Sequence, residues 1–399
     1  MSVATKAVAA GLSRTAIKVD HALAEMDKRI DWLSRLTPIN VDAIREGFAA
    51  SRHRDMPDSE YGEGLDNHSP VWRRELFGLP VREIDDPLIE TLLLEKQREL
   101  DRQIELVRMR DREGFIQASI DLFGGVSDTL LASARRIIAN VPDTALGDRD
   151  ADCDDIVAAA EDDLAWYRSR APGFGGRVVR DPNHGVGLYT QMGDFHVATD
   201  TRVPATRVDA LVQHEIGTHA VTRHNGRRQP LRTLADGLAD YDAMQEGLAV
   251  IGEYLAGYLP PARLRVLAGR VIAAHMAVEE ANGAEIYAAM REECLLGPED
   301  SFQTALRAKR GGGLTKDAVY LDGVIQLLAY LANGGDFEIL FLGKFALKQF
   351  ATLEKLIARG TIHRPELLPR YLERPEARAR LAAVRTLDVS ELYQESPAS

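Results

Sequence analysis

Apolar residues recur at helical spacing through the first part of the chain, from about Thr15 to Ala139. Leu100, Ile104 and Val107 follow one another at steps of four and three residues, which places their side chains on one face of a helix. A polar stretch from Arg52 to Ser69 interrupts this pattern and predicts a long loop. The N-terminal part of the chain is therefore predicted to be helical, with one extended connection.

A glycine-rich break follows the last of these helices. A further helix is expected over Ala151–Ser169, and the run Ala171-Pro-Gly-Phe-Gly-Gly176 after it is typical of a loop. We place a boundary here, between an N-terminal helical region at residues 1–170 and a second region at residues 171–399. The two regions are expected to pack together as one unit.

The pattern then changes to the alternation of short strands. Arg177–Arg180, Gly187–Gln191 and Asp194–Thr199 alternate between apolar and polar residues, and turn residues separate them at 181–185 and 192–194. The sequence predicts two or three short antiparallel strands in this segment.

Helical spacing returns after Pro204 and continues to the end of the chain. Helices are expected at Thr206–His224, Leu238–Gly257, Ala262–Glu280, Gly283–Cys294, Lys316–Asn333 and Gly343–Arg359. The predicted fold class is α+β, mainly helical, with one small antiparallel sheet just before the helix that starts near Thr206.

The net charge of the chain limits the kinds of molecule it is expected to bind, and its cysteine content indicates the state of its thiols. The chain of 399 residues has 61 acidic and 49 basic residues and a net charge of −12, which opposes attraction to nucleic-acid phosphates and anionic lipid. We therefore expect neither nucleic acid nor a membrane as partner. Cys153 and Cys294 are too few for a disulfide framework and are expected to be buried thiols. The first apolar stretch of the chain is interrupted by Lys6, so this stretch makes a poor signal peptide. We therefore expect a cytoplasmic protein.

The segment His214-Glu-Ile-Gly-Thr-His219 carries the first candidate chemistry. Histidines at i and i+4 of a helix can bind one metal ion while the glutamate after the first histidine acts as base. Here the histidines are five residues apart, which in a regular α-helix separates them by about 140°. A π-bulge near Gly217 would bring His214 and His219 to one face and leave Glu215 as the base. The alternative is that the two histidines are unrelated residues on opposite faces.

A third metal ligand is available from the segment around Glu246, which lies 27 positions after His219 (246 − 219). A chain reversal at Asn225-Gly226 would bring this second helix back along the first. Two histidines and one glutamate leave a coordination position open for water, as in catalytic zinc sites. Asp242, one turn before Glu246, either orients a ligand or is a surface carboxylate.

Cationic residues near a glycine run form a candidate anion site. Arg310-Gly-Gly-Gly-Leu-Thr315 and Lys316 precede an apolar helix, so backbone amides and two cations could receive a substrate carboxylate. A plain turn with Thr315 as helix cap is the alternative. Tyr320 is a candidate hydrogen-bond donor to the oxyanion or, alternatively, a core residue. Arg180 or Arg223 could supply the cation instead.

Three ordered segments carry a family resemblance. They are His214-Glu-Ile-Gly-Thr-His219, Gln245-Glu-Gly-Leu-Ala249 and Arg310-Gly-Gly-Gly-Leu-Thr-Lys-Asp-Ala-Val-Tyr-Leu321. Together they resemble the family that contains the microtubule-associated tyrosine carboxypeptidases and the bacterial proteins named flavohemoglobin expression-modulating QEGLA motif proteins. The resemblance extends from about Gly187 to Tyr371.

This resemblance implies a zincin-like zinc metallopeptidase. His214, His219 and Glu246 then bind zinc, Glu215 is catalytic, and residues 171–399 form the catalytic region. In the animal members it implies removal of the C-terminal tyrosine of α-tubulin. We do not carry that substrate over, because a net charge of −12 repels an acidic tail. Nothing in the sequence resembles a DNA-reading module.

The sequence therefore predicts a zinc-dependent peptidase, of the carboxypeptidase type, that acts on the C-terminus of a peptide or protein. A non-haem Fe(II) oxygenase is one alternative, since two histidines and a carboxylate also form the iron triad of those enzymes. The glutamate beside the first histidine favours hydrolysis, which needs a base there. A regulatory protein that keeps the metal site without turnover is the other alternative.

Overall fold

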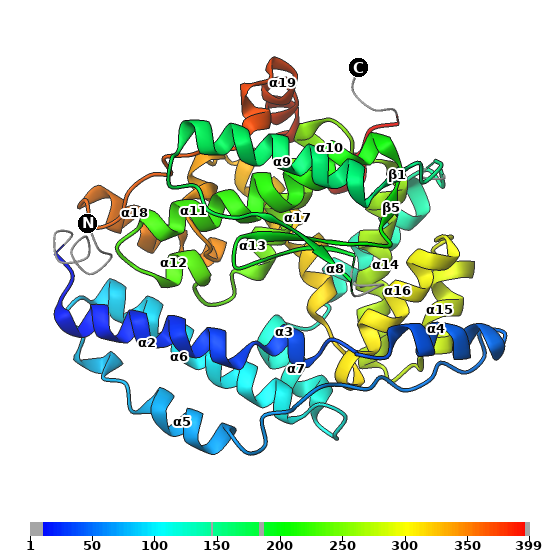
Figure 1. Cartoon of the computed structure of the whole chain (residues 1–399), viewed down its shortest axis with the longest axis horizontal. Coiled ribbons are helices and arrows are strands. Elements are labelled where there is room, and N and C mark those ends of the chain that lie inside the picture. Colours follow the sequence, from blue (N-terminus) through cyan, green and yellow to red (C-terminus); the bar gives the residue numbers. More distant parts are fainter. Residues whose placement is uncertain (1–10, 145–146, 183–186, 396–399) are drawn as a thin grey trace.

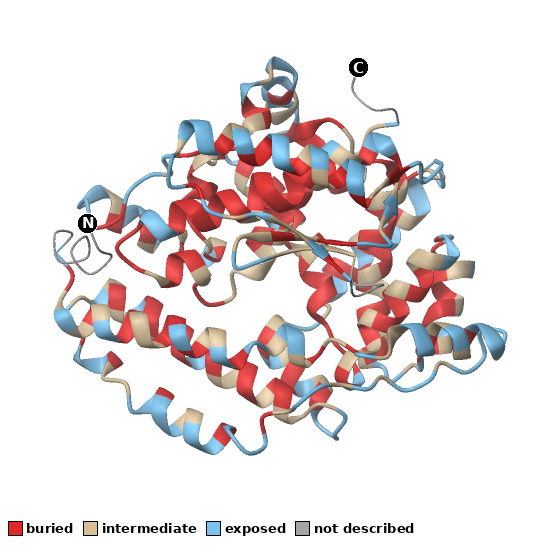
Figure 2. Cartoon of the chain, viewed as in Figure 1, coloured by how far each residue is buried: buried red, intermediate tan, exposed pale blue. Residues whose placement is uncertain are grey.

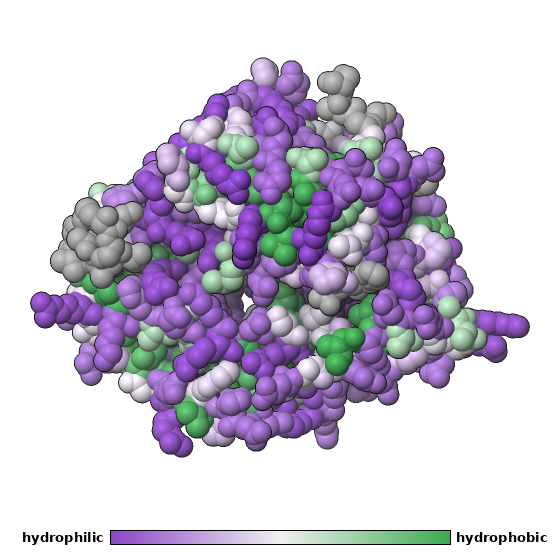
Figure 3. Space-filling view, in the orientation of Figure 1, coloured by the Kyte–Doolittle hydropathy of each residue, from purple (hydrophilic) through white to green (hydrophobic). Residues whose placement is uncertain are grey.

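The structure, a computed structural model, describes residues 11–144, 147–182 and 187–395. The N-terminal stretch through Ala10, on which the signal-peptide prediction rests, and part of the turn predicted at 181–185 lie outside the described residues. Within the described ranges, no helix has both the length and the apolar character needed to cross a membrane. Figure 3 shows a face that is mostly hydrophilic, with apolar residues in small patches.

The N-terminal region is helical, as the spacing of its apolar residues predicts. Its elements are α2 (Arg14–Ile30), α3 (Trp32–Arg35), α4 (Val41–Ala50), α5 (Ser69–Phe77), η1 (Val81–Glu83), α6 (Pro87–Arg108), α7 (Phe115–Phe123), α8 (Asp128–Asn140) and α9 (Cys153–Arg170). Helices α2, α5 and α6 lie along one side of the molecule (Figure 1). The long loop predicted from Arg52 to Ser69 is confirmed, because α4 ends at Ala50 and α5 begins at Ser69.

A three-stranded sheet follows α9. Its strands are β2 (Val178–Asp181), β3 (Leu188–Gln191) and β4 (Asp194–Ala198), in the order β2-β4-β3. Strands β3 and β4 form the expected antiparallel hairpin, whose two-residue turn has positive φ at Met192 and Gly193.

The prediction that all strands are antiparallel is wrong for β2, which pairs with β4 in parallel. The tight hairpin inserts β4 between β2 and β3, so the neighbour of β2 is the strand that runs in its own direction. A second pairing, of β1 (Ala151–Asp152) with β5 (Arg202–Val203), was not predicted, because two residues are too short to show alternation.

The helix that carries the histidine motif is one continuous run. It consists of η2 (Ala205–Arg207), α10 (Val208–Val212), the π-helical segment η3 (Gln213–Ala220) and α11 (Val221–Arg228). The turn predicted at Asn225-Gly226 is wrong, since both residues lie inside α11. Asn225 is buried and donates to the carbonyls of Phe341 and Leu367. A Cβ on Gly226 would lie 2.3 Å from the Leu234 carbonyl oxygen, so this glycine permits close packing.

Helices α13 (Asp242–Ala256) and α17 (Val319–Ala332) cross in the middle of the molecule (Figure 1). A Cβ on Gly323 would lie 1.7 Å from the carbonyl oxygen of Ala243, and one on Gly247 would lie 2.4 Å from the carbonyl carbon of Gly323. The two glycines thus bring the helix backbones together. This contact fixes Glu246, next to Gly247, relative to the residues of α17.

The remaining helices surround this pair. They are α12 (Thr233–Asp236), α14 (Pro261–Val278), α15 (Gly283–Glu292), α16 (Pro298–Lys309), α18 (Phe350–Ala358) and α19 (Pro375–Val384), with 3₁₀ turns η4 (Arg310–Gly312), η5 (Lys316–Ala318), η6 (Glu338–Phe341), η7 (Leu347–Gln349), η8 (Arg370–Glu373) and η9 (Val389–Glu391). Helix α16 was not predicted. The helix predicted from Gly343 begins only at Phe350, because Lys344 exchanges backbone hydrogen bonds with the segment Leu234–Leu238.

The largest buried apolar cluster contains residues from both halves of the chain, among them Leu23, Leu93, Leu234 and Leu340. Buried positions face the interior and exposed positions lie on the outer faces of the helices (Figure 2). Cys153 and Cys294 are buried free thiols, as expected. The mainly helical α+β class is confirmed, with the three-stranded sheet just before the motif helix accompanied by the short β1–β5 pair.

Candidate metal centre

The two motif histidines lie on one face of the helix because the backbone widens there. In η3 the amide of Val221 donates to the carbonyl of Ile216, five residues earlier, which is the hydrogen bond of a π-helix. The ring centroids of His214 and His219 are consequently only 5.2 Å apart. The widening predicted from the five-residue spacing is confirmed, and the alternative of opposite faces is excluded.

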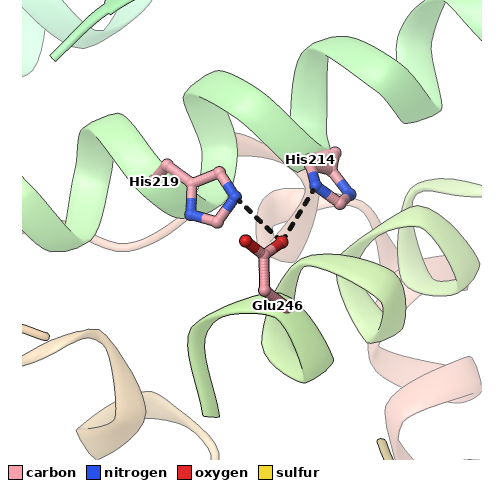
Figure 4. Close-up of side chains that lie close together, drawn as sticks. All are labelled: His214, His219 and Glu246. Atoms are coloured by element: carbon pink, nitrogen blue, oxygen red, sulfur yellow. Dashed lines mark ion pairs between the residues drawn. The ribbon is translucent and has the colours of Figure 1, made fainter. Parts of the chain in front are cut away.

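Glu246 on α13 completes a compact group with the two histidines (Figure 4). Its Oε2 atom is 3.8 Å from Nε2 of His214 and 3.7 Å from Nε2 of His219. One potential ligand atom from each residue lies within 4.8 Å of the others. The exposed fraction of each of these side chains is 14% or less, so water screens their charges weakly.

The chemistry of this group fits a metal ion. Glu246 Oε2 is buried and has no hydrogen-bond partner within the part of the chain that the structure describes. His214 uses Nδ1 in a bond with Glu253, and burial lowers the pKa of His219 to about 3, which leaves a neutral imidazole. Acceptor atoms that converge without a donor between them are unfavourable unless a cation lies among them. The three residues could therefore hold a metal ion, with a further position left for water.

Glu253, two turns after Glu246 on α13, holds His214 in place. Its Oε1 is 2.8 Å from Nδ1 of His214 and 3.1 Å from a terminal nitrogen of Arg263, and its Oε2 pairs with Arg207. Burial raises the pKa of Glu253, but the Arg263 and Arg207 guanidinium groups outweigh it and hold the pKa well below its usual range. The ionised carboxylate thus fixes the orientation of the imidazole.

Sequence reasoning missed Glu253 and its two arginines. One signal was available, because a metal-binding histidine needs a partner for its second nitrogen and Glu253 lies seven positions after Glu246 on the same helix.

We expect Glu253→Gln to weaken metal binding by about 10–100-fold, the usual effect of losing a carboxylate that orients a ligand. The amide keeps the shape but not the charge that stabilises the His214 contact. Competition titration against a chelator measures the affinity, and thermal unfolding verifies the fold. Glu354→Gln, an exposed position on α18, is the matched control and should bind metal like the wild type. Equal affinity in both variants would show that Glu253 has no orienting role.

Glu215 lies beside the metal group, and one of its two carboxylate oxygens has no hydrogen-bond partner among the described residues. Its Oε1 is 3.9 Å from Nε2 of His214, and its Oε2 is buried without a hydrogen-bond partner among the described residues. Burial raises the pKa of Glu215 above its usual range. The hydroxyl of Thr190 donates to the backbone carbonyl of Glu215, which ties β3 to η3. This position is compatible with the predicted role of base, which stays a prediction.

Lys316, Asp242 and Tyr320 gather around the other oxygen of Glu246. Lys316 Nζ is 3.6 Å from Glu246 Oε1 and 3.4 Å from an oxygen of Asp242, and it lies 5.6 Å from the centroid of the Tyr320 ring. Burial raises the pKa of Glu246, but the positive charge of Lys316 contributes most to the opposing effect, which lowers the pKa to about 2. Lys316 therefore keeps Glu246 ionised, and burial raises the pKa of Tyr320 to about 12.

The glycine run before α17 is a tight turn whose amides bond within the protein. Gly311 donates to the Tyr61 hydroxyl, Gly313 to the Arg310 carbonyl and Thr315 to Ser119 Oγ. Positive φ at all three glycines explains the residue type. These bonds favour the turn alternative for the backbone, although Thr315 does not cap with its side chain.

Of the other predicted cations, Arg310 lies near Arg307 and Arg270, whereas Arg180 lies elsewhere. Arg310 has a buried Nε without a partner in the described part of the chain, and burial lowers its pKa to about 10. Arg180 on β2 points to the start of α9, where it pairs with Asp154. Arg223 is paired with Asp236.

A mainly helical α+β protein with a buried two-histidine, one-carboxylate group defines the class: a protein built around a candidate metal centre of the catalytic type. The family model of the microtubule-associated tyrosine carboxypeptidase matches residues 46–388. The chain therefore belongs to the microtubule-associated tyrosine carboxypeptidase family.

The individual relatives share less than 30% sequence identity with this chain over the matched region, and they are longer than it. The rat "Microtubule-associated tyrosine carboxypeptidase 1" is 27% identical over 210 residues, which cover 48% of this chain and 42% of the relative. The mouse "Putative tyrosine carboxypeptidase MATCAP2" is 28% identical over 202 residues, which cover 46% of this chain and 36% of the relative. The matched region thus spans less than half of either relative.

Among solved structures, the crystal structure of a "putative lipoprotein from Colwellia psychrerythraea" matches with a TM-score of 0.45 and 13% identity, covering 80% of this chain and 68% of that one.

Proposed function

We propose that this protein is a zinc-dependent metallocarboxypeptidase that removes the C-terminal residue of a peptide or protein. The observation that carries the proposal is the convergence of acceptor atoms from His214, His219 and Glu246 beside Glu215, whose Oε2 has no hydrogen-bond partner among the described residues. Nitrogen and oxygen ligands of this kind suit zinc. Membership of a family whose relatives are named tyrosine carboxypeptidases supports the reaction class. Tyrosine is accordingly the first terminal residue to test.

Each side chain of the site has a separate role in the proposed hydrolysis. When bound, zinc would polarise the scissile carbonyl and lower the pKa of a water molecule toward about 7. Glu215 accepts the proton of the attacking water and delivers it to the leaving amine. Glu253 keeps His214 oriented, and Lys316 keeps Glu246 ionised. Tyr320, beside Lys316, is a candidate donor to the developing oxyanion.

Strand β3 offers a place for an extended substrate. Strand β4 is paired on both sides, whereas β3 pairs only with β4 among the described strands. The outer edge of β3 therefore has no strand partner among the described residues, which makes it a candidate for pairing with a peptide backbone. Because Thr190 on β3 contacts Glu215, a peptide on this edge would lie next to the candidate metal centre.

The test combines elemental analysis of the purified protein with digestion of a peptide library whose ends are either free or amidated. We expect about one zinc per chain and loss of a single C-terminal residue from free-ended peptides only. A free carboxylate forms charge-assisted hydrogen bonds that an amide cannot form. Internal cleavage would contradict the carboxypeptidase assignment. Iron in place of zinc would favour the oxygenase alternative, and bound metal without any turnover would favour a regulatory protein.

A further inference from the structure

A group of cationic side chains, here called the cationic cluster, lies beside the candidate metal centre. Its members come from α14, α16 and the turn before α17, and they are Arg263, Arg270, Arg307, Arg310 and Lys316. Two of them contact the residues of the centre directly, since Arg263 bonds to Glu253 and Lys316 lies 3.6 Å from Glu246. The cluster is therefore continuous with the site of the proposed reaction.

Arg270 differs from Arg307 because its nearest carboxylate, Asp317, is already bound more closely by Arg307. Arg307 binds Asp317 with two hydrogen bonds of 2.5 and 2.6 Å. The Nε atom of Arg270 is 3.9 Å from an Asp317 oxygen that already accepts from Arg307. Within the described residues Arg270 donates no hydrogen bond, although only 16% of its side chain is exposed and its Nε is buried.

A largely buried guanidinium whose Nε has no hydrogen-bond acceptor and whose nearest carboxylate is shared with another arginine is only partly stabilised by the protein. Removing a cation from water is unfavourable unless an anion or hydrogen-bond acceptors replace the water. Burial, followed by the neighbouring Arg307, lowers the pKa of Arg270, and the opposing effect of Asp317 is too small to offset them. A ligand that brings an anionic group to Arg270 would remove this cost.

The position of Arg270 fits one anion in particular. Its guanidinium carbon is 5.1 Å from the centroid of the Tyr320 ring, and Tyr320 lies beside Lys316 and Glu246. Arg270 and Lys316, which lies 3.6 Å from the candidate metal ligand Glu246, thus both lie close to the ring of Tyr320. A carboxypeptidase cleaves the peptide bond after the carbonyl of the penultimate residue. The terminal carboxylate belongs to the next residue, whose Cα lies about 3.8 Å from that of the penultimate residue.

We infer that Arg270 binds the free C-terminal carboxylate of the substrate. This inference rests on the proposed carboxypeptidase function. The planar guanidinium matches a carboxylate in a two-point contact. Lys316 is a weaker candidate because Asp242 and Glu246 already surround its ammonium group. Arg180 pairs with Asp154 at the start of α9.

The test measures binding, so it does not depend on turnover. The probes are N-acetyl-Ala-Ala-Ala-Tyr with a free C-terminal carboxylate and the same peptide with a C-terminal amide, titrated by calorimetry into zinc-loaded Glu215→Gln protein. We expect the acid to bind at least about tenfold more tightly than the amide, the effect of one hydrogen bond between charged groups. Adding Arg270→Gln should bring this ratio close to one without changing the affinity for the amide.

Further variants separate charge, geometry and fold. Arg270→Lys should restore part of the preference for the acid, because it keeps the charge but loses the two-point contact. Arg135→Gln, at an exposed position on α8, is the matched control and should keep the full ratio. Metal content and the thermal unfolding temperature of each variant establish that the site is intact.

The outcomes distinguish this inference from the proposed function. A preference for the acid that Arg270→Gln abolishes supports the carboxylate site even if the wild type cleaves neither peptide. An unchanged preference in Arg270→Gln, or no preference before substitution, overturns it. Loss of the preference in Arg310→Gln but not in Arg270→Gln would assign the carboxylate to Arg310 instead.

Discussion

Replacement of Glu215 by glutamine is expected to reduce peptide hydrolysis by at least about 100-fold while metal and fold are retained. The amide has the shape of the carboxylate but cannot accept the proton of the attacking water. Glu215 is not part of the group of three ligand atoms, so its loss should leave metal content unchanged. The measurements are single-residue release from tyrosine-terminated peptides, elemental analysis and thermal unfolding.

Glu354→Gln serves again as the matched control and should hydrolyse peptides like the wild type, since this glutamate is exposed on α18. Wild-type turnover in Glu215→Gln with normal metal content would remove Glu215 from the mechanism. In that case the carboxylate would be structural and the oxygenase alternative would regain support.

His219→Ala and Glu246→Ala are each expected to lose the metal, and with it all hydrolysis. Both side chains belong to the only group of three or more potential ligands found among the described residues, and each loss leaves only two of the three. Elemental analysis after dialysis should show about one zinc in the wild type and close to none in the variants. A metal bound at 1,000 times its dissociation constant stabilises the folded state by about 4 kcal/mol, so chelation should lower the unfolding temperature of the wild type alone.

His275→Ala provides the control for the loss of an imidazole, because His275 is half-buried on α14 and lies outside the candidate metal centre. It should retain zinc and the response to chelation. Stoichiometric zinc in both His219→Ala and Glu246→Ala would refute the proposed ligand set.

Some features of the site follow from local sequence and were predicted correctly. The five-residue spacing of His214 and His219 requires a widened helix turn if both are to face one ion, and η3 has the corresponding hydrogen bonds. Glu246 was identified from its motif, and it lies where both imidazoles can reach it. The hairpin of β3 and β4 follows from its turn residues.

Other local patterns misled because tertiary contacts use the same residues differently. Asn225-Gly226 is a typical turn pair, yet the glycine admits the backbone of Leu234 and the asparagine bonds to two distant carbonyls. Strand β2 shows the alternation of a strand, but alternation carries no information about the direction of its neighbour. The close crossing of α13 and α17 depends on Gly247 and Gly323, which are 76 positions apart (323 − 247).

The sequence by itself determined the helical character of the chain, the small sheet and the shared face of His214 and His219, because spacing along one helix fixes which side chains lie together. Glu246 was named from the sequence, but the packing of α13 against η3 brings it to the two histidines. Only the tertiary structure decided which charges are paired. Glu253 orients His214 because Arg207 and Arg263 meet it from other elements, and Arg270 must share Asp317 because Arg307 binds that carboxylate more closely. The pairing of charged side chains depends on which carboxylates, from distant parts of the chain, lie close to each cation. Local sequence patterns do not contain those distances.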